Sequence, residues 1–355
     1  MIAARGLRRF GRGLLLTGVA VLLHLGGVAC GGSGGGGGDG GGSDDTISGS
    51  ELRISGSELG ELPAIAVVAG DPRHTAATAA GNLYLTSGDR STLTLLKSWP
   101  ESLTDGVAYG VFRANWSPDR KRLGVSIASW DGDPYARLAV MTLAGRAMRT
   151  ITEPSGDFLI SWSADGRRLL YEDFFHSDRE GIWSIPVAPG AEEGRIHLSA
   201  TGRLLKRGGR SFRLAPEGSS IAAEFDGGIL VLDLDSGAVR QLTHGDDWLA
   251  GWSPDSRSIL FNRSRPAPDD DMSDVYAIDA DGTDLRQLTS DGAAQAMDWS
   301  PDGALVLFLR SAASDAKRPN KQVWELWVMD ADGGRQTRLP FNRPQLEVVA
   351  ADWST

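Results

Sequence analysis

The sequence predicts an all-β protein, a six-bladed β-propeller of four-stranded antiparallel blades, on two observations. The first is a turn motif, Trp-Ser-(Pro/Ala)-Asp, which occurs at Trp116–Asp119, Trp162–Asp165, Trp252–Asp255 and Trp299–Asp302. A weaker copy lies at Leu214–Gly218 and a truncated one at Trp353–Ser354. The second observation is the spacing, since consecutive copies lie 38 to 54 residues apart, which is the period of propeller blades. Six copies predict six blades within residues 61–355.

Each repeat contains the pieces of one blade. In the most complete repeat the expected strands are 296–299, 305–309, 325–329 and 336–339. The second of them is apolar throughout, as expected of a strand that packs between neighbouring sheets. The same order recurs in the other repeats, with outer strands expected at 195–198, 239–243 and 286–289.

The two ends of the domain are expected to share one blade. The last repeat has only its first strand before the sequence stops at Thr355. The strands expected to complete its blade are 64–68, 82–86 and 92–97. Such a blade removes the open sheet edges that would otherwise favour aggregation.

The chemistry of the motif explains the turn. Proline presets the backbone for the second position of a tight turn, and aspartate accepts hydrogen bonds from nearby backbone N–H groups. A glycine, where present, is expected at the positive-φ position before the next strand. The tryptophan is large enough to fill the wedge between adjacent blades.

These repeats resemble the TolB-type Pro-Asp repeats, which are relatives of the WD-repeat propellers. The resemblance covers residues 62–355 and implies a propeller of the bacterial envelope. TolB proteins carry a separate α/β domain ahead of the propeller, whereas this chain has a Gly-rich segment there.

The first 29 residues have the layout of an export signal. Four arginines precede an apolar stretch at Leu14–Leu25, which is too short to span a bilayer. Cys30, the single cysteine, follows small residues and resembles the lipidated cysteine of bacterial lipoproteins, although Gly27 stands where leucine is usual. The alternatives are an uncleaved anchor, a free secreted thiol at Cys30 and a twin-arginine signal at Arg8–Arg9.

Residues 30–60 are expected to form a flexible tether, because glycine populates all of backbone space. The chain has a net charge of −10, and the only charged residues of the signal are arginines, so the mature chain is more acidic still. An acidic surface without basic clusters argues against nucleic acid, and membrane contact is expected only through the lipid.

Long connections are expected on one face of the propeller, and insertions on one face of a repeat protein often mark a binding surface. They lie between second and third strands and at the crossovers between blades. The expected rim residues are Trp130, Asp131, Tyr135, Phe174, Phe175, His176, Arg263, Arg265, Arg318 and Lys321. Aromatic and arginine side chains are typical interface anchors, although packing of these loops on their own stems is the alternative.

The residues before the motif tryptophan are expected at one height on the inner strands. Among them, Asp298 and Asp352 belong to neighbouring blades and are candidates for a ligand or cation in the channel. The alternative is that both bond to backbone groups.

Other apparent sites have simpler explanations. Asp279–Asp284 begins like a calcium loop but lacks the distal glutamate, so it is expected to be a blade turn. Asp269–Asp271 is an acidic loop tip that could hold a cation weakly. The G-x-S-x-G pattern at Gly31–Gly35 lies in the tether. No histidines show metal-ligand spacing, and no cofactor is expected.

The sequence therefore predicts a lipid-anchored binding module of the cell envelope that contacts a protein partner through its loop-rich face. Gly31, directly after the cysteine, predicts sorting to the outer membrane. An envelope enzyme, a lyase or hydrolase with its site at the channel mouth, is the second hypothesis. A propeller that binds glycan or another small ligand through Trp130 and Tyr135 is the third.

Overall fold

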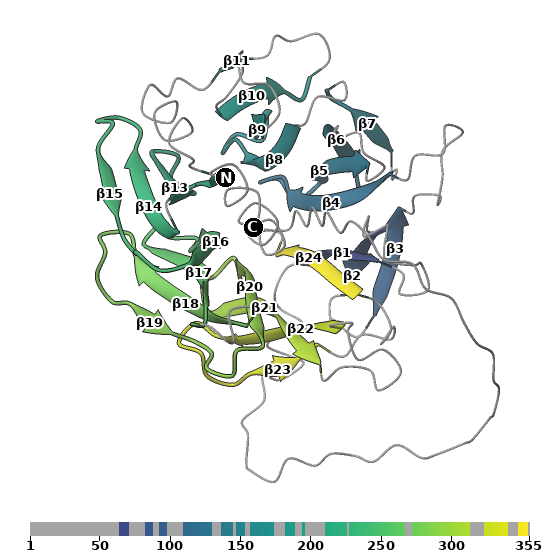
Figure 1. The fold of residues 1–355 in the computed structure, drawn as a ribbon. Coiled ribbons are helices and arrows are strands. Elements are labelled where there is room, and N and C mark those ends of the chain that lie inside the picture. Colours follow the sequence, from purple (N-terminus) through teal and green to yellow (C-terminus); the bar gives the residue numbers. More distant parts are fainter. Residues whose placement is uncertain are drawn as a thin grey trace, which may run out of the picture.

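The computed structural model describes residues 64–70, 82–87, 92–97, 109–129, 136–144, 147–152, 157–173, 182–188, 194–195, 210–225, 227–266, 272–312, 323–339 and 347–353. These residues form six four-stranded antiparallel sheets and no helix. The sheets are arranged around a common axis as the blades of a propeller (Figure 1). The predicted fold class is confirmed.

The blades are numbered here along the chain. Blade 1 contains β4 (Tyr109–Trp116), β5 (Arg122–Ser129), β6 (Ala136–Thr142) and β7 (Met148–Thr150). Blade 2 contains β8 (Asp157–Trp162), β9 (Arg168–Asp173), β10 (Ile182–Pro186) and β11 (Gly194–Arg195). Blade 3 contains β12 (Arg210–Leu214), β13 (Ser220–Phe225), β14 (Gly228–Asp233) and β15 (Val239–Gln241). Blade 4 contains β16 (Asp247–Trp252), β17 (Ser258–Ser264), β18 (Ser273–Asp279) and β19 (Arg286–Gln287). Blade 5 contains β20 (Ala294–Trp299), β21 (Leu305–Ala312), β22 (Val323–Asp330) and β23 (Thr337–Arg338).

The closing blade joins the two ends of the domain, as the sequence predicts. Its strands are β24 (Glu347–Trp353), β1 (Ile65–Gly70), β2 (Asn82–Thr86) and β3 (Leu93–Lys97), in that order. β24 pairs antiparallel with β1, and Trp353 lies opposite Ile65. The C-terminal strand therefore occupies the inner position that β4, β8, β12, β16 and β20 occupy in the other blades.

The motif turn is held by its serine and aspartate. In blade 5, the Ser300 hydroxyl donates to Asp302 (2.6 Å) and accepts from the backbone N–H of Leu305 (2.8 Å), while Asp302 accepts from the N–H of Ala304 (3.0 Å). The same bonds occur in blades 1, 2 and 4. The serine hydroxyl thus holds the turn together with the aspartate, a role that the sequence pattern does not predict.

The residue after the motif aspartate adopts positive φ whether or not it is glycine. Gly166 and Gly303 do so, with φ of 65° and 71°, but so do Arg120 at 56° and Ser256 at 60°. The hydrogen bonds of the turn impose this conformation, which costs a residue with a Cβ more than it costs glycine.

In blades 3, 4 and 5 the outermost strands are shorter than predicted. β19 ends at Gln287, because the N–H groups of Leu288 and Thr289 both point to the carbonyl of Val275 and the Thr289 hydroxyl accepts from the N–H of Val275 (2.9 Å). Thr243 does the same for Ile229 in blade 3. The threonine side chain takes over pairing that a longer strand would supply.

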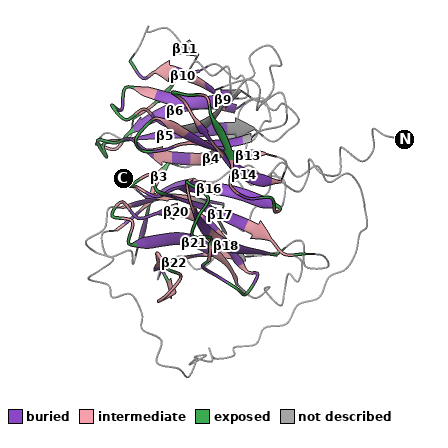
Figure 2. Cartoon of the chain, turned by 90° about the vertical axis from the view of Figure 1, so that its left-hand side faces the viewer, coloured by how far each residue is buried: buried purple, intermediate pink, exposed green. Residues whose placement is uncertain are grey.

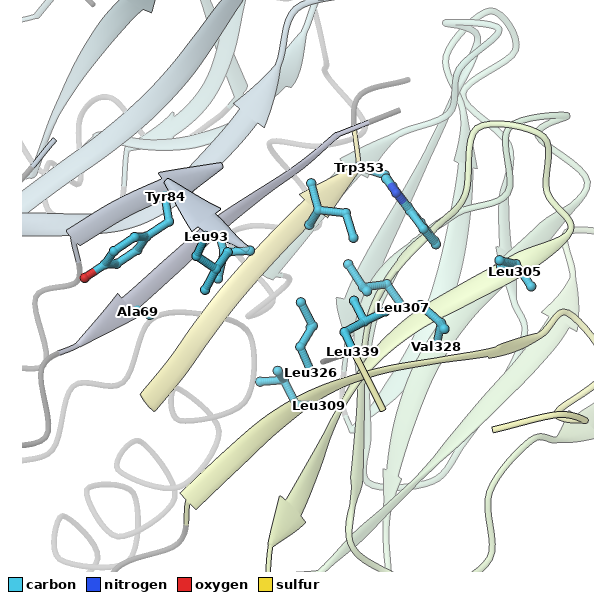
Figure 3. Packing of buried hydrophobic residues seen from close by; sticks show 12 residues of the cluster. Ala69, Tyr84, Leu93, Leu305, Leu307, Leu309, Leu326, Val328, Leu339 and Trp353 are labelled. Atoms are coloured by element: carbon cyan, nitrogen blue, oxygen red, sulfur yellow. The ribbon is translucent and has the colours of Figure 1, made fainter. Parts of the chain in front are cut away.

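The core consists of six apolar clusters, and each lies where two consecutive blades meet. The buried residues follow the strands of the stacked blades (Figure 2). Figure 3 shows the cluster between blade 5 and the closing blade, where Trp353 approaches Leu307 and Val328. All five motif tryptophans are buried, as the wedge-filling role predicts.

Connections on the two faces of the propeller differ in length. Five residues separate the first and second strands in each of blades 1 to 5, and five to seven separate the third and fourth strands in all six. Backbone bonds join these two sets, for example from Leu234 to Ser219 and from Ala280 to Arg257, so they share one face, the short-turn face. The connections between second and third strands range from two residues in blade 3 to eleven in the closing blade, and with the crossovers they form the long-connection face.

Candidate functional site

The inner strands bring together the residues that precede the motif position. These residues are Asn115, Ser161, Arg213, Gly251, Asp298 and Asp352. All but Gly251, which is buried, are partly exposed. Each inner strand also contains a β-bulge where it pairs with its neighbour. Bulges redirect side chains and are common next to functional sites.

Asp298 and Asp352 each reach into the next blade. Asp298 accepts from the backbone N–H of Trp353 in the closing blade (3.0 Å) and from that of Trp299 (2.8 Å). Asp352 accepts from the backbone N–H of Trp116 in blade 1 (2.9 Å) and from the Asn115 side chain (2.9 Å). The backbone-bonded alternative therefore describes both carboxylates, and no ligand is needed to explain their position.

Their surroundings oppose ionisation. Burial and the neighbouring charge of Asp352 raise the pKa of Asp298 well above its usual value. Burial also raises the pKa of Asp352 to about 6, against the opposing effects of the Trp116 N–H, Asn115 and the Arg113 charge.

Arg113, which the sequence analysis missed, supplies the compensating charge. Burial lowers the pKa of its guanidinium, while the carboxylates of Asp352, Glu172 and Asp298 raise it. Arg113 lies on β4 in blade 1, so one cation serves carboxylates from blade 2, blade 5 and the closing blade.

Two buried acids on second strands were also missed. Glu172 is 8% exposed and Glu224 is 3% exposed. Burial and the charge of Glu224 raise the pKa of Glu172 to about 8, although the Arg113 charge and the backbone N–H of Phe212 lower it. The Oε2 atom of Glu172 is buried without a hydrogen-bond partner, so its surroundings favour the neutral acid.

A positional signal could have identified these acids. They lie ten residues after the motif position, where blade 1 has Ser126 and blade 4 has Asn262. Glu224 accepts from the N–H of Leu249 (2.8 Å) and Asn262 from that of Ala296 (2.7 Å), each in the next blade. In blade 5 and the closing blade the same position holds the apolar Leu309 and Val68.

Two of the expected rim residues, Arg263 and Arg265, lie in the described part of the chain, and both form ion pairs. Arg263 donates two bonds to the buried Asp247, at 2.6 and 2.9 Å, and stacks over Phe261 and Tyr276. Arg265 bonds Asp274 at 2.9 Å. Both brace the base of the long-connection face.

The remaining rim residues lie outside the described part of the chain. They are Trp130, Asp131, Tyr135, Phe174, Phe175, His176, Arg318 and Lys321, and Cys30 and Asp269–Asp271 lie outside it as well. Their roles stay predictions.

Asp279–Asp284 is a blade turn, as expected. Asp279 accepts from the Ser258 hydroxyl (2.7 Å), and Asp281 accepts from the N–H (2.9 Å) and hydroxyl (2.6 Å) of Thr283. Within the described ranges, no three His, Cys, Asp or Glu side chains are grouped so that they could hold a metal ion. The same ranges contain no helix long and apolar enough to cross a bilayer.

Solved TolB structures are similar in fold. TolB from Acinetobacter baumannii matches with a TM-score of 0.61 and 20% identity, over 82% of this chain and 66% of that chain. A putative TolB from Agrobacterium tumefaciens matches with a TM-score of 0.52 and 21% identity, over 78% of this chain and 88% of that chain. No protein-family model and no curated protein sequence matches the chain. At these identities the likeness shows a TolB-like propeller fold.

Proposed function

We propose that this protein is a non-enzymatic binding module of the bacterial cell envelope that contacts a protein partner through its long-connection face. The observation that carries the proposal is the contrast in connection length between the two faces. The motif turns keep five residues in five blades, while the opposite connections vary from two to eleven. Variable length on one face of a constant scaffold is typical of a binding surface.

Blade 3 indicates that the scaffold does not need the long connections. Only residues 226 and 227 join β13 to β14, and Phe225 pairs directly with Gly228 across the turn. Gly227 has a φ of 77°, which a two-residue hairpin turn requires. The extra residues in the other blades are therefore available for a role other than folding.

Ion pairs give this face a rigid base. Arg263 with Asp247 joins the ends of two paired strands, and Arg265 with Asp274 and Arg310 with Asp291 each join a strand to a neighbouring connection, in blades 4 and 5. Because Asp247 and Asp274 are buried, breaking these pairs would leave a charge without compensation. A fixed base reduces the entropy lost when the loops bind a partner.

The envelope location rests on the N-terminal sequence. The export signal, Cys30 at its end and the Gly-rich segment support a lipid anchor and a tether that holds the propeller away from the membrane. In the test, Cys30→Ser should no longer partition with membranes. Equal membrane association of Cys30→Ser and the wild type would contradict the anchor.

The binding face is tested by shortening one connection. In the first variant, residues 313–322 of blade 5 are replaced by Asp-Gly, the two-residue connection between β13 and β14 of blade 3. A second variant carries Trp130→Ala and Tyr135→Ala. Both should lose capture of the partner recovered by wild type from its native envelope and keep the wild-type melting temperature. Loss of a hot-spot aromatic commonly costs about 2 kcal/mol of binding.

The control is Arg257→Ala on the short-turn face, where the side chain is 83% exposed. It should leave capture intact. If Arg257→Ala abolishes capture and the two loop variants do not, the proposal that the long-connection face binds the partner is wrong. Retention of cell-wall glycan by wild type, with no captured protein, would replace the protein partner by a glycan ligand.

A further inference from the structure

The contact between two consecutive blades, called a seam here, is bridged by a side-chain acceptor in much of the ring. From blade 2 to blade 5 the acceptor lies on a second strand and bonds an N–H of the next inner strand. The acceptors are Glu172, Glu224 and Asn262, which bond Phe212, Leu249 and Ala296. At the two seams of the closing blade the corresponding position is apolar, and Asp298 and Asp352 provide the bridge instead.

Among the motif tryptophans, indole bonds cross two seams of the ring, and neither is a seam of the closing blade. Trp162 and Trp252 each donate from Nε1 to a carbonyl of the preceding blade, on Asn115 and Arg213, both at 3.0 Å. The Nε1 atoms of Trp116, Trp299 and Trp353 are buried without a partner. The seams on either side of β24 therefore lack the indole bond and carry a carboxylate bond.

We propose that Asp298 and Asp352 form a proton-sensitive latch that holds the closing blade to both of its neighbours. One carboxylate bonds the closing blade to blade 5 and the other bonds it to blade 1. The closing blade is also the one whose inner strand is joined to the other three only by pairing between β24 and β1. A change in charge at either carboxylate acts directly on the attachment of the C-terminal strand.

Arg113 and the carboxylates themselves are the charges that face the latch. The charges of Asp298 and Asp352 repel each other, Arg113 from β4 interacts with both, and Glu172 also interacts with Arg113. From blade 4, Gly251 lies against Asp298 and brings no charge.

Several other charged groups on the packed strands form ion pairs of their own. β1 contains no titratable residue. Ion pairs on the remaining strands join Asp247 to Arg263, Arg310 to Asp291, Glu325 to Arg338 and Asp330 to Arg335.

The raised pKa values of Asp298 and Asp352 determine how ring closure depends on pH. Because the pKa of each latch carboxyl is raised in the closed ring, the closed ring binds protons more tightly than an open one. The stabilisation is complete below the ordinary carboxyl pKa and is lost as the pH rises through the raised values. For Asp352, with a pKa of about 6, closure should weaken by about tenfold between pH 5 and pH 8.

Hydrogen exchange at single amides tests the latch in the full chain. Protection factors, corrected for the intrinsic effect of pH, are measured for the N–H groups of Trp116, Trp353 and Ala296 at pH 5 and pH 8. Protection at Trp116 should fall by about tenfold and protection at Trp353 should fall as well, whereas Ala296, bonded by the uncharged Asn262, should keep its protection. Equal protection at Trp116 and Trp353 at both pH values would overturn the proposal.

Three variants separate the latch from general effects of pH. The double variant Asp298→Asn with Asp352→Asn should abolish the pH-dependent fall, and Asp302→Asn, in a motif turn of blade 5, should retain it. Asn262→Asp places a carboxyl at the seam between blades 4 and 5 and should create a fall at Ala296. A fall that persists in the double variant, or an Ala296 amide unchanged in Asn262→Asp, would contradict proton control by these carboxyls.

Discussion

Side-chain hydrogen bonds join consecutive blades in two regions of the ring, but different residues make them. One region is the seams from blade 2 to blade 5, and the other is the two seams of the closing blade. The first group uses acceptors on second strands, Glu172, Glu224 and Asn262. The second uses inner-strand aspartates, because Leu309 and Val68 occupy the second-strand position. The repeat thus preserves the bond to the next blade and not the residue that makes it.

The comparison also separates packing from hydrogen bonding. Every seam has its apolar cluster, and Trp353 is fully buried in the one between blade 5 and the closing blade (Figure 3). Apolar burial is therefore common to all seams, while the polar bond varies.

Deleting Val349–Thr355 should break the closing blade completely. It removes Asp352 and Trp353, exposes the edge of β1 and uncovers the neighbouring clusters. We expect aggregation or loss of cooperative unfolding, measured by size-exclusion chromatography and calorimetry. Deleting residues 30–56 is the control and should leave the melting temperature unchanged. A monomeric deletion variant with the wild-type melting curve would contradict closure by β24.

Glu172→Gln should change how stability depends on pH. Burial raises the pKa of Glu172 to about 8, so its contribution to stability is complete below the ordinary pKa of glutamate and is lost as the pH rises through 8. Glutamine resembles the neutral acid and keeps an oxygen for the Phe212 N–H. The variant should be more stable than wild type at pH 9, by on the order of 2 kcal/mol, and similar at pH 5. Denaturant unfolding at both pH values measures this, and a variant less stable at pH 9 would refute it.

Trp252→Phe should cost more than Trp353→Phe. Both remove a similar volume from a buried wedge, but only the Trp252 indole has a partner, the Arg213 carbonyl at 3.0 Å. The expected difference is about 1 kcal/mol in the free energy of unfolding, the usual contribution of one hydrogen bond. An equal loss in the two variants would mean that the indole bond adds nothing to its seam.

Ser117→Ala and Ser253→Ala should cost the same, about 1 kcal/mol each. Both serines make the same bonds inside a motif turn, although one turn adjoins the closing blade and the other belongs to blade 4. Thermal unfolding of both variants tests the equality. A much larger loss for Ser117→Ala would mean that the turns, and not only the seams, differ between the two regions.

Part of the candidate site could be predicted and part could not. Asp298 and Asp352 stand next to the motif tryptophans, so their place on the inner strands follows from the repeat. Glu172 and Glu224 lie inside strands whose apolar neighbours dominate the pattern, and their positional signal emerges only when all blades are aligned. The other repeats have no arginine at the position of Arg113, three residues before the motif position, so the repeat gives no signal for it, and the carboxylates it compensates come from three other blades.

The sequence by itself determined the architecture of this protein. A turn motif with a constant local structure and a period near one blade specifies the number of blades, and the incomplete last repeat specifies how the ring closes. These features are local, because a few adjacent residues set each turn and each strand.

Only the tertiary structure decided which side chains bridge the seams and how strongly they hold a proton. Residues far apart in the chain, such as Arg113, Asp298 and Asp352, become neighbours only when the ring is closed. Their pKa values depend on burial and on one another's charge, and both are properties of the assembled ring.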